Sequence, residues 1–275
     1  MAATRPVDAF TGTAPTSTVA VALRLAAYWA TVFRRTWRGG VVSAVVTPLL
    51  YVVAMGVLLG GFVEADPTEL EGATSYLAFV APGLLAAHAM QLAIGETTFP
   101  VMSAVKWHKT YFAMHAAPIG IGSVVLAHLA FTVARTTLAC AVFVAVLVPF
   151  DVFATWWAPF AVLAVQVLLT AAFAAPVFAF SAGLDNEWSF NLLFRLGMIP
   201  MFLFSGAFFP VANLPGPLEA LARATPLWHG VDLSRMLALD TLEAGPALVH
   251  VAYLLVLVAL GGWLAVRRLT GRLVR

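Results

Sequence analysis

Six long apolar stretches constrain this chain more than any other feature of its sequence. They cover residues 41–61, 76–97, 119–148, 156–180, 190–209 and 247–266. A helix that crosses the hydrocarbon core of a bilayer needs about 20 apolar residues. Charged residues make up only 10% of the chain, against about 25% in an ordinary soluble domain. The pattern predicts an all-α membrane protein with six transmembrane helices.

The charges outside these stretches are sorted onto alternate loops. The N-terminal segment and the C-terminal tail are basic, whereas loop 62–75 holds only acidic charges. Because basic flanks stay on the cytoplasmic side of a membrane, we expect both termini in the cytoplasm. Loop 98–118, with its two lysines, follows the same rule. Loop 181–189 carries two acidic residues and gives the rule no support.

The N-terminal residues divide into a tail and an amphipathic segment. Residues 1–18 are rich in Thr, Ala and Pro, which predicts a disordered cytoplasmic tail without a cleavable signal peptide. Residues 20–38 alternate a polar and an apolar face at helical spacing, which favours an elbow helix in the membrane interface. The alternative is a cytoplasmic extension of the first span. The residues that define the elbow helix are Arg24, Arg35, Trp37 and Arg38. Residues 19–275 are expected to form a single membrane domain.

Segment 210–246 is too polar to span a membrane and too apolar for a solvated loop. Pro210, Pro215, Pro217 and Pro226 divide it into short pieces, because proline breaks a helix. One piece pairs Glu219 with Arg223 at a spacing of four residues, which stabilises a short helix. We expect one or two short helices that lie on the outer leaflet or dip into it.

The sequence carries no motif for covalent chemistry. It contains no phosphate-binding GxxxxGK[ST] loop, no HExxH, no GxSxG and only one cysteine, Cys140. Its six histidines are scattered, so we expect no metal site. The basic residues are too sparse for nucleic-acid binding. We therefore expect a non-catalytic protein.

Four ionisable residues lie at or inside the predicted spans: Glu96, His128, Arg135 and Arg195. Such groups are costly in lipid, so they should face protein or a wet cavity. His128 and Arg135 are seven residues apart and share one helix face. These groups could contact a substrate or act in gating. Alternatively, Glu96 and Arg135 could form a neutralised pair that holds the second and third spans together.

The loop between the second and third spans is basic and aromatic. Its candidate contact residues are Lys106, Trp107, His108, Lys109, Tyr111 and Met114. Trp107, Tyr111 and Met114 recur at helical spacing, so one helix could present an aromatic knob to a soluble partner. The alternative is that Trp107 and Tyr111 only anchor the loop in the membrane interface.

At three places the chain resembles the permease subunits of type-2 ABC exporters, in particular those of nodulation-factor and daunorubicin-type drug-resistance exporters. The matching pieces are Glu96 through Lys109-Thr-Tyr-Phe-Ala to Ala117-Pro118, then Phe204-Ser-Gly-Ala-Phe-Phe-Pro210, then Leu214-Pro with Thr225-Pro-Leu-Trp-His-Gly230. They occur in the family's order, and the resemblance covers nearly the whole chain after about residue 20.

The resemblance implies an assembly and several residue roles. A permease of this family pairs with a second copy or a paralogue and with two copies of an ATP-binding subunit. ATP and Mg would bind to that subunit, and this chain would bind no cofactor. The elbow and a coupling helix at about residues 103–114 would dock on it. Short external helices would cap the outer cavity, where Phe208, Phe209 and Trp228 would form an external gate.

These features together predict the permease subunit of an ATP-driven exporter in a bacterial plasma membrane. Its cargo would be a lipid, a lipid-linked saccharide or an amphipathic drug. One rival is an intramembrane lipid-modifying enzyme that uses Glu96, His88 or His128. Another is a secondary transporter or channel without an ATPase partner, whose polar residues should line a path at the midplane. The sequence leaves the substrate, and the choice between homodimer and heterodimer, open.

Overall fold

The protein is all-helical in the part that the structure describes. This computed structural model describes residues 25, 29–31, 34, 46–59, 70–117 and 119–274, and every regular element among them is a helix. Four helical stretches are long and apolar enough to cross a membrane: Tyr76–Trp107, Ile121–Phe150, Ala158–Ala182 and Ala244–Leu273. Two shorter apolar helices, Val46–Met55 and Trp188–Phe204, lie where the first and fifth spans were predicted.

The described residues form the following helices in chain order. The order is η1 (Val52–Leu59), α2 (Tyr76–Thr97), α3 (Phe99–Met102), η2 (Ser103–Trp107), α4 (Thr110–Ala116), α5 (Ile121–Leu147), η3 (Val148–Phe150), α6 (Ala158–Ala182), α7 (Trp188–Leu192), η4 (Leu193–Met198), α8 (Ile199–Phe204), η5 (Val211–Asn213), α9 (Gly216–Arg223), α10 (Pro226–Ala238) and α11 (Ala244–Leu273). η1, η2 and η4 are π-helical, which widens the helix locally.

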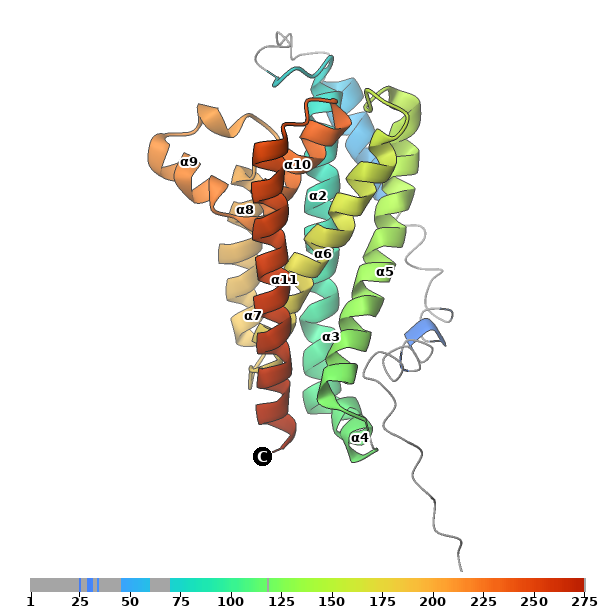
Figure 1. Cartoon of the computed structure of the whole chain (residues 1–275), viewed down its shortest axis with the longest axis vertical. Helices are drawn as coiled ribbons and strands as arrows, with labels where there is room; N and C mark the ends of the chain where they lie inside the picture. The colour runs from blue at the N-terminus through green and yellow to red at the C-terminus, as the bar shows by residue number, and fades with distance from the viewer. Residues whose placement is uncertain are drawn as a thin grey trace, which may run out of the picture.

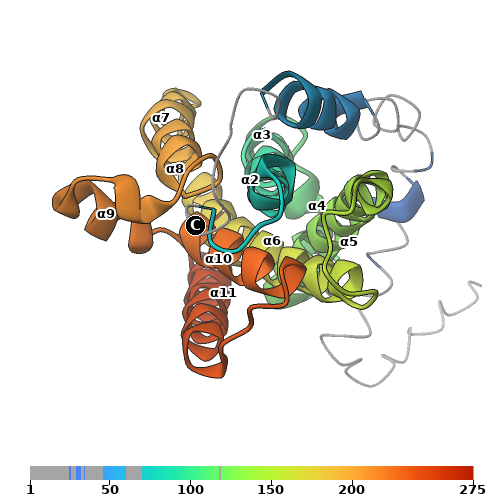
Figure 2. The same ribbon diagram turned by 90° about the horizontal axis from the view of Figure 1, so that it is seen from above.

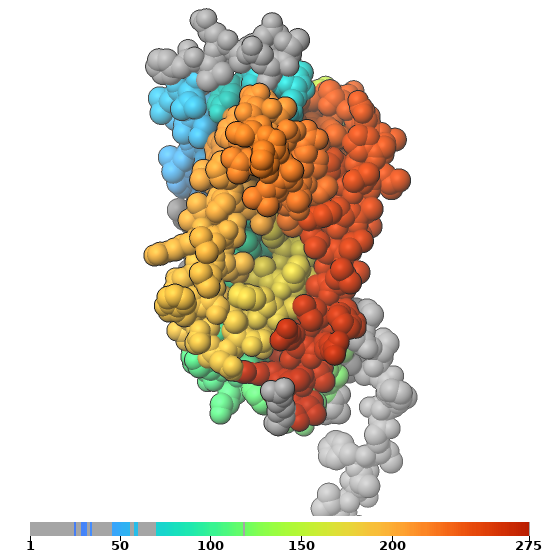
Figure 3. Space-filling model, turned by 90° about the vertical axis from the view of Figure 1, so that its left-hand side faces the viewer, coloured from blue at the N-terminus to red at the C-terminus, as the bar shows by residue number. Residues whose placement is uncertain are grey.

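Helix α6 lies at the centre of the bundle and packs against α2, α5, α10 and α11 (Figure 2). Helix α4 and the C-terminus lie at one end of the bundle, and α9 and α10 lie at the opposite end (Figure 1). Helix α9 projects sideways from α8, and Figure 3 shows the face on which it stands above the α7–α8 column. The two ends of the bundle therefore carry different short helices.

The predicted boundaries of three spans agree closely with the structure. α2 coincides with the predicted stretch 76–97, and the ends of α5 and α6 lie within two residues of 119–148 and 156–180. α11 extends the predicted stretch 247–266 at both ends. The boundary at 209 was wrong, because the helix ends at Phe204. A turn follows in which Gly206 has φ +81°, a conformation that ends a helix.

Several predictions fall on residues outside those described. These are the tail 1–18, most of the elbow 20–38 with Arg24, Arg35, Trp37 and Arg38, and the ends of the first span 41–61. Within the elbow the structure places helical residues at 25, 29–31 and 34. Trp29 packs against α5, as described below.

Gly261 allows α11 to approach α6 closely. A Cβ atom on Gly261 would lie 2.6 Å from both the ring Cδ and the backbone N of Pro176, and 2.9 Å from the carbonyl carbon of Ala175. We expect Gly261→Ala to lower the free energy of unfolding by roughly 1–3 kcal/mol, because backbone must move to admit the methyl group. Gly262→Ala is the control, since its Cβ would meet nothing within 4 Å. Thermal unfolding midpoints in detergent test this. Equal midpoints for both variants would contradict the close approach.

Candidate functional site

The basic aromatic loop forms two short helices, so the single helix predicted for residues 103–114 was wrong. η2 ends at Trp107, where the Nδ1 atom of His108 lies 2.5 Å from the hydroxyl oxygen of Ser103. Lys109 then adopts φ +51°, a left-handed conformation that a helix interior does not contain. Helix α4 begins at Thr110. The break resets the helical register between Trp107 and the residues that follow.

This reset separates residues that were expected to share one surface. Lys106, Trp107, His108 and Lys109 are exposed, and Trp107 is 49% exposed. Tyr111, by contrast, is 0% exposed and stacks on Phe178 of α6 at 6.1 Å between ring centroids. Met114 is half-buried beside the same core. The loop therefore presents Trp107 and its basic neighbours to the outside, whereas Tyr111 anchors it from within.

Tyr111 meets His128, and His128 meets the end of α2. The hydroxyl of Tyr111 lies 2.8 Å from Nδ1 of His128, and Nε2 of His128 lies 3.1 Å from the backbone carbonyl oxygen of Glu96. That carbonyl lacks its usual helical donor, because the residue four positions on is Pro100, which has no N–H. A carbonyl only accepts, so Nε2 carries the proton and Nδ1 accepts from Tyr111. Burial raises the pKa of Tyr111 well above its usual range, which keeps this hydroxyl a donor.

Aromatic rings close the space around His128. Trp29, from the predicted elbow, meets the His128 ring edge-on at 5.1 Å between centroids and stacks on Phe131 at 5.5 Å. Phe178 approaches His128 at 5.3 Å. Segments from the elbow, α2, α4, α5 and α6 thus converge on one buried imidazole. We call Tyr111, His128 and the Glu96 carbonyl the inner joint.

Glu96 and Arg135 form the ion pair that was one of the two alternatives for them. Nη1 of Arg135 lies 2.7 Å from Oε1 of Glu96, and both side chains are partly exposed. Arg135 lies about two turns beyond His128 on α5, so both residues of the predicted face meet Glu96. Arg195 does not join them. It lies on the exposed face of the π-helical segment η4, and that it faces a wet cavity or another protein stays a prediction.

The three residues of the predicted external gate lie on two segments that meet at Gly206, where a Cβ atom would lie 3.8 Å from Cδ1 of Trp228 and 3.8 Å from the carbonyl oxygen of Phe209. The backbone carbonyl of Phe208 accepts a hydrogen bond from the Tyr76 hydroxyl at 3.1 Å. Phe209 is half-buried in the same turn. Trp228 instead packs against His229 and His250, with ring centroids 4.9 and 5.1 Å away. The gate residues thus contact two different parts of the bundle end.

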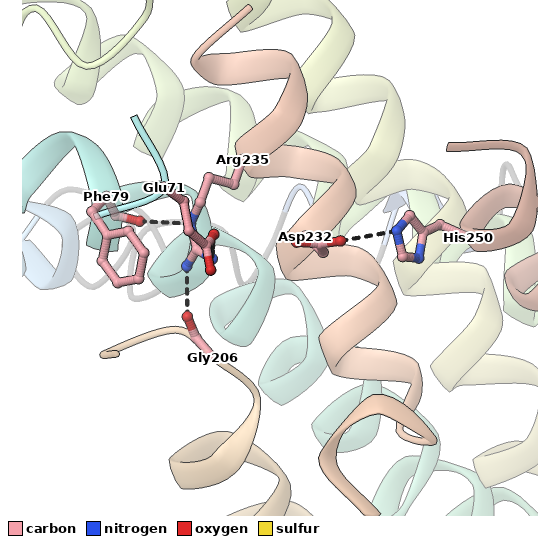
Figure 4. A network of polar contacts seen from close by, with 6 residues as sticks. All are labelled: Glu71, Phe79, Gly206, Asp232, Arg235 and His250. Atoms are coloured by element: carbon pink, nitrogen blue, oxygen red, sulfur yellow. Dashed lines mark hydrogen bonds and ion pairs between the residues drawn. The ribbon is translucent and has the colours of Figure 1, made fainter. Parts of the chain in front are cut away.

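Sequence reasoning missed Arg235, which ties together the end of the bundle that carries α9 and α10 (Figure 4). Its guanidinium donates to the carbonyl oxygens of Phe79 at 3.2 Å and Gly206 at 2.5 Å, and to the carboxylate of Glu71 at 2.8 Å. It also lies over the Phe79 ring at 3.9 Å. Burial lowers the pKa of Arg235 and the Glu71 carboxylate opposes that shift. The one available signal was an arginine within an otherwise apolar helix face.

Two histidines and an aspartate join α10 to α11 beside this network. Nε2 of His250 lies 3.0 Å from Oδ2 of Asp232 (Figure 4), and Nδ1 of His250 lies 2.7 Å from Nδ1 of His229. The His229 ring also stacks on Tyr253 at 3.9 Å. Burial, and to a smaller extent His250, lowers the pKa of His229 to about 4, and Asp232 opposes the shift. His229 is therefore neutral in the folded protein at neutral pH.

This cluster predicts a pH dependence of stability. Between pH 6.5 and about 4 the unfolded chain binds a proton at His229 that the folded protein does not, so stability falls as the pH is lowered. The full shift corresponds to about 3 kcal/mol, and because solvent screens part of it we expect a loss of roughly 1–2 kcal/mol across that window and a plateau below it. His229→Gln should remove this part of the slope, whereas His115→Gln, at an exposed position, should retain it. Thermal midpoints from pH 7.5 to 4 measure both, and identical slopes would contradict the assignment.

The residues of the rival enzyme hypothesis are not assembled into a catalytic set. His88 lies about two turns before Glu96 on α2 and packs edge-on against Phe143 at 5.6 Å. Both ring nitrogens of His128 and the carboxylate of Glu96 are engaged in the contacts above. Among the residues that the structure describes, no group of three His, Cys, Asp or Glu side chains could hold a metal ion.

Comparison with known proteins finds similarity to one transporter family along most of the chain. The pattern that defines the ABC-2 type transporter family matches residues 24–239. Nodulation protein J of Sinorhizobium fredii is 30% identical over 251 residues, which cover 89% of this chain and 94% of that protein. Nodulation protein J of Rhizobium meliloti is 29% identical over 230 residues, with coverages of 81% and 84%. The same protein of Rhizobium leguminosarum bv. trifolii is 29% identical over 254 residues, with coverages of 90% and 94%.

Proposed function

The chain belongs to the ABC-2 type transporter family, and from this premise we propose that it is the non-catalytic permease subunit of an ATP-driven exporter. The observation that carries the proposal is the loop after α2. Its outer side exposes Trp107 between basic residues, and its inner side is fixed to α5 and α6 by Tyr111. A loop that is exposed on one side and anchored on the other can receive force from a soluble subunit and pass it to the spans.

We propose six spans with both termini in the cytoplasm, in which Val46–Met55 and Trp188–Phe204 belong to the first and fifth spans. The position of α4 and the C-terminus at the same end of the bundle supports this topology (Figure 1). The acidic loop 181–189 is compatible with the same side, because its charges are paired locally. Asp185 pairs with Arg272 at 2.5 Å, and Glu187 pairs with Lys106 at 3.6 Å. We assign residues 19–275 to one domain of a bacterial plasma-membrane protein.

The proposed assembly contains two permease copies, identical or paralogous, and two ATP-binding subunits that hold ATP and Mg. Closure of the ATP-binding subunits would push on the loop after α2. The two permease copies would then rock as rigid bundles around a central path. Cargo would leave past the end of the bundle that carries α9 and α10.

The proposed cargo is a lipid, a lipid-linked saccharide or an amphipathic drug. An apolar groove between η4–α8 and α9 supports this class, because its lining offers no charge. It is lined by Leu196, Gly197, Pro200, Met201, Phe204, Leu218, Leu221, Ala222 and Thr225. The groove lies on the face shown in Figure 3. Acyl chains and other apolar groups fit such a lining better than a free sugar does.

Co-purification from the native host, followed by reconstitution in liposomes, tests the proposal. We expect an ATP-binding subunit to co-purify, and we expect ATP hydrolysis by the complex to rise with one of the three cargo classes. Each class is added separately, and a soluble sugar serves as the control. Transport by the permease alone without nucleotide would contradict the proposal, and so would a covalent change in the added lipid.

A further inference from the structure

We propose that His128 is a positioning residue, which transmits movement of the loop after α2 to a hinge between α2 and α3. The inference rests on the proposed function, because it describes how a docked subunit would act on the spans. It assigns to His128 and Tyr111 neither contact with the ATP-binding subunit nor contact with cargo. Three features of the structure carry the movement: a hinge, a link to it, and the side chains that act on the link.

The hinge is the break between α2 and α3. Thr98 has φ −93° and ψ −95°, outside the helical region, and Pro100 removes the N–H that would bond to the Glu96 carbonyl. Two threonine side chains bond to carbonyl oxygens near the break. The hydroxyl of Thr97 donates to the carbonyl oxygen of Ala93 at 2.6 Å, and that of Thr98 donates to the carbonyl oxygen of Gly95 at 3.3 Å. A helix that has lost backbone bonds at one point bends there.

The link is the imidazole of His128. It is 2% exposed, and its Nε2–H supplies the donor that Pro100 withholds from Glu96. The carboxylate of Glu96 pairs with Arg135, which is also on α5. Glu96 is therefore held on α5 at two points, by its backbone through His128 and by its side chain. The interior is close-packed and has few voids, so a displaced His128 side chain must move its neighbours. A displacement of His128 therefore shifts the hinge between α2 and α3.

The side chains that act on His128 are Tyr111 and Trp29. Tyr111 is fully buried, so a partner protein cannot touch it. Its helix α4 exposes Phe112, and a partner pressing there moves Tyr111. The 2.8 Å hydrogen bond passes that movement to Nδ1 of His128. Trp29, edge-on to the same ring, gives the elbow access to the same point. Two elements implied to dock on the ATP-binding subunit thus act on one imidazole.

Two substitutions isolate the link. Tyr111→Phe removes only the hydroxyl and keeps the ring against Phe178. His128→Gln keeps an N–H donor for Glu96 but replaces the rigid ring that joins Tyr111 to Glu96 with a flexible amide side chain. Tyr253→Phe is the matched control, because its hydroxyl donates to a backbone carbonyl, that of Ala224, at 2.7 Å but lies away from the inner joint. Each is made in a Cys140→Ala background that carries Thr74→Cys, an exposed reporter just before α2.

The experiment uses the complete complex with its co-purified ATP-binding subunit in liposomes, and ATP is the only ligand added. One readout is the amount of subunit retained. The other is the ATP-dependent change in the rate at which a membrane-impermeant maleimide labels Cys at position 74. We expect full subunit retention in all variants. The ATP-dependent change should fall about fivefold in Tyr111→Phe, the factor that corresponds to about 1 kcal/mol for one hydrogen bond.

His128→Gln should show a similar loss, and the double variant should lose no more than the worse single variant, because both break one link. Tyr253→Phe should respond as the parent does. An undiminished ATP response in Tyr111→Phe overturns the inference and leaves the proposed function standing. Loss of the subunit from that variant also overturns it, because Tyr111 would then act in docking. If the parent retains no subunit or shows no ATP response, the proposed function itself fails. Tyr111→Phe alone decides the matter if His128→Gln does not fold.

Discussion

Arg235→Ala is expected to lower the free energy of unfolding by about 3 kcal/mol. The guanidinium is 4% exposed and joins α10 to α2 and to the turn after α8. Its removal leaves two backbone carbonyls without this donor, and each unpaired buried group costs about 1–3 kcal/mol. It also removes the contact with the Phe79 ring. The thermal unfolding midpoint of the purified protein measures the loss.

Two control variants separate the buried hydrogen bonds from the ion pair. Glu71 is 40% exposed, so Glu71→Gln should cost less than about 1 kcal/mol, as surface salt bridges do. Arg223→Ala breaks an exposed pair with Glu219 and should also have a small effect. A loss in Glu71→Gln as large as that in Arg235→Ala would mean that the ion pair, and not the carbonyl contacts, stabilises this end of the bundle.

The positions of the long helices could be predicted because membrane insertion depends on local composition. α2 begins and ends where the apolar stretch does, since polar residues at both ends mark the limits of the hydrocarbon core. The fifth span could not be placed as well. Its apolar run continues through Phe208 and Phe209, but Gly206 turns the chain before them. Hydropathy registers apolar residues and is insensitive to a single left-handed glycine.

The sequence indicated which residues lie in the loop after α2, but not how their side chains are oriented. Helical spacing put Trp107 and Tyr111 on one face, and the positive φ of Lys109 separated them. No residue type near Lys109 indicates a left-handed backbone there, so this break could not be predicted from the sequence. The missing donor for Glu96 was visible in the sequence as Pro100 four residues later. The donor that replaces it comes from His128, and its identity depends on how α5 packs against α2. Arg235 depends in the same way on packing between distant segments.

Trp107→Ala is expected to weaken association with the ATP-binding subunit by about 30-fold, the effect of losing one aromatic anchor worth about 2 kcal/mol. Trp107 is 49% exposed at the end of η2, beside Lys106. Two roles were open for it: a knob that docks on a soluble partner and an anchor in the membrane interface. Both roles require an exposed ring, so exposure alone does not separate them.

A comparison with Trp188 separates the docking role of Trp107 from the anchoring role. It begins α7, is 71% exposed and lies on an element linked to the same loop through the ion pair of Glu187 with Lys106. An exposed tryptophan at the start of an apolar helix is typical of an interfacial anchor, so Trp188→Ala should leave subunit association unchanged. If Trp107→Ala weakens association and Trp188→Ala does not, Trp107 is a docking residue. If neither changes it, the ring of Trp107 anchors the loop in the interface, and the basic side chains around it must provide the docking surface.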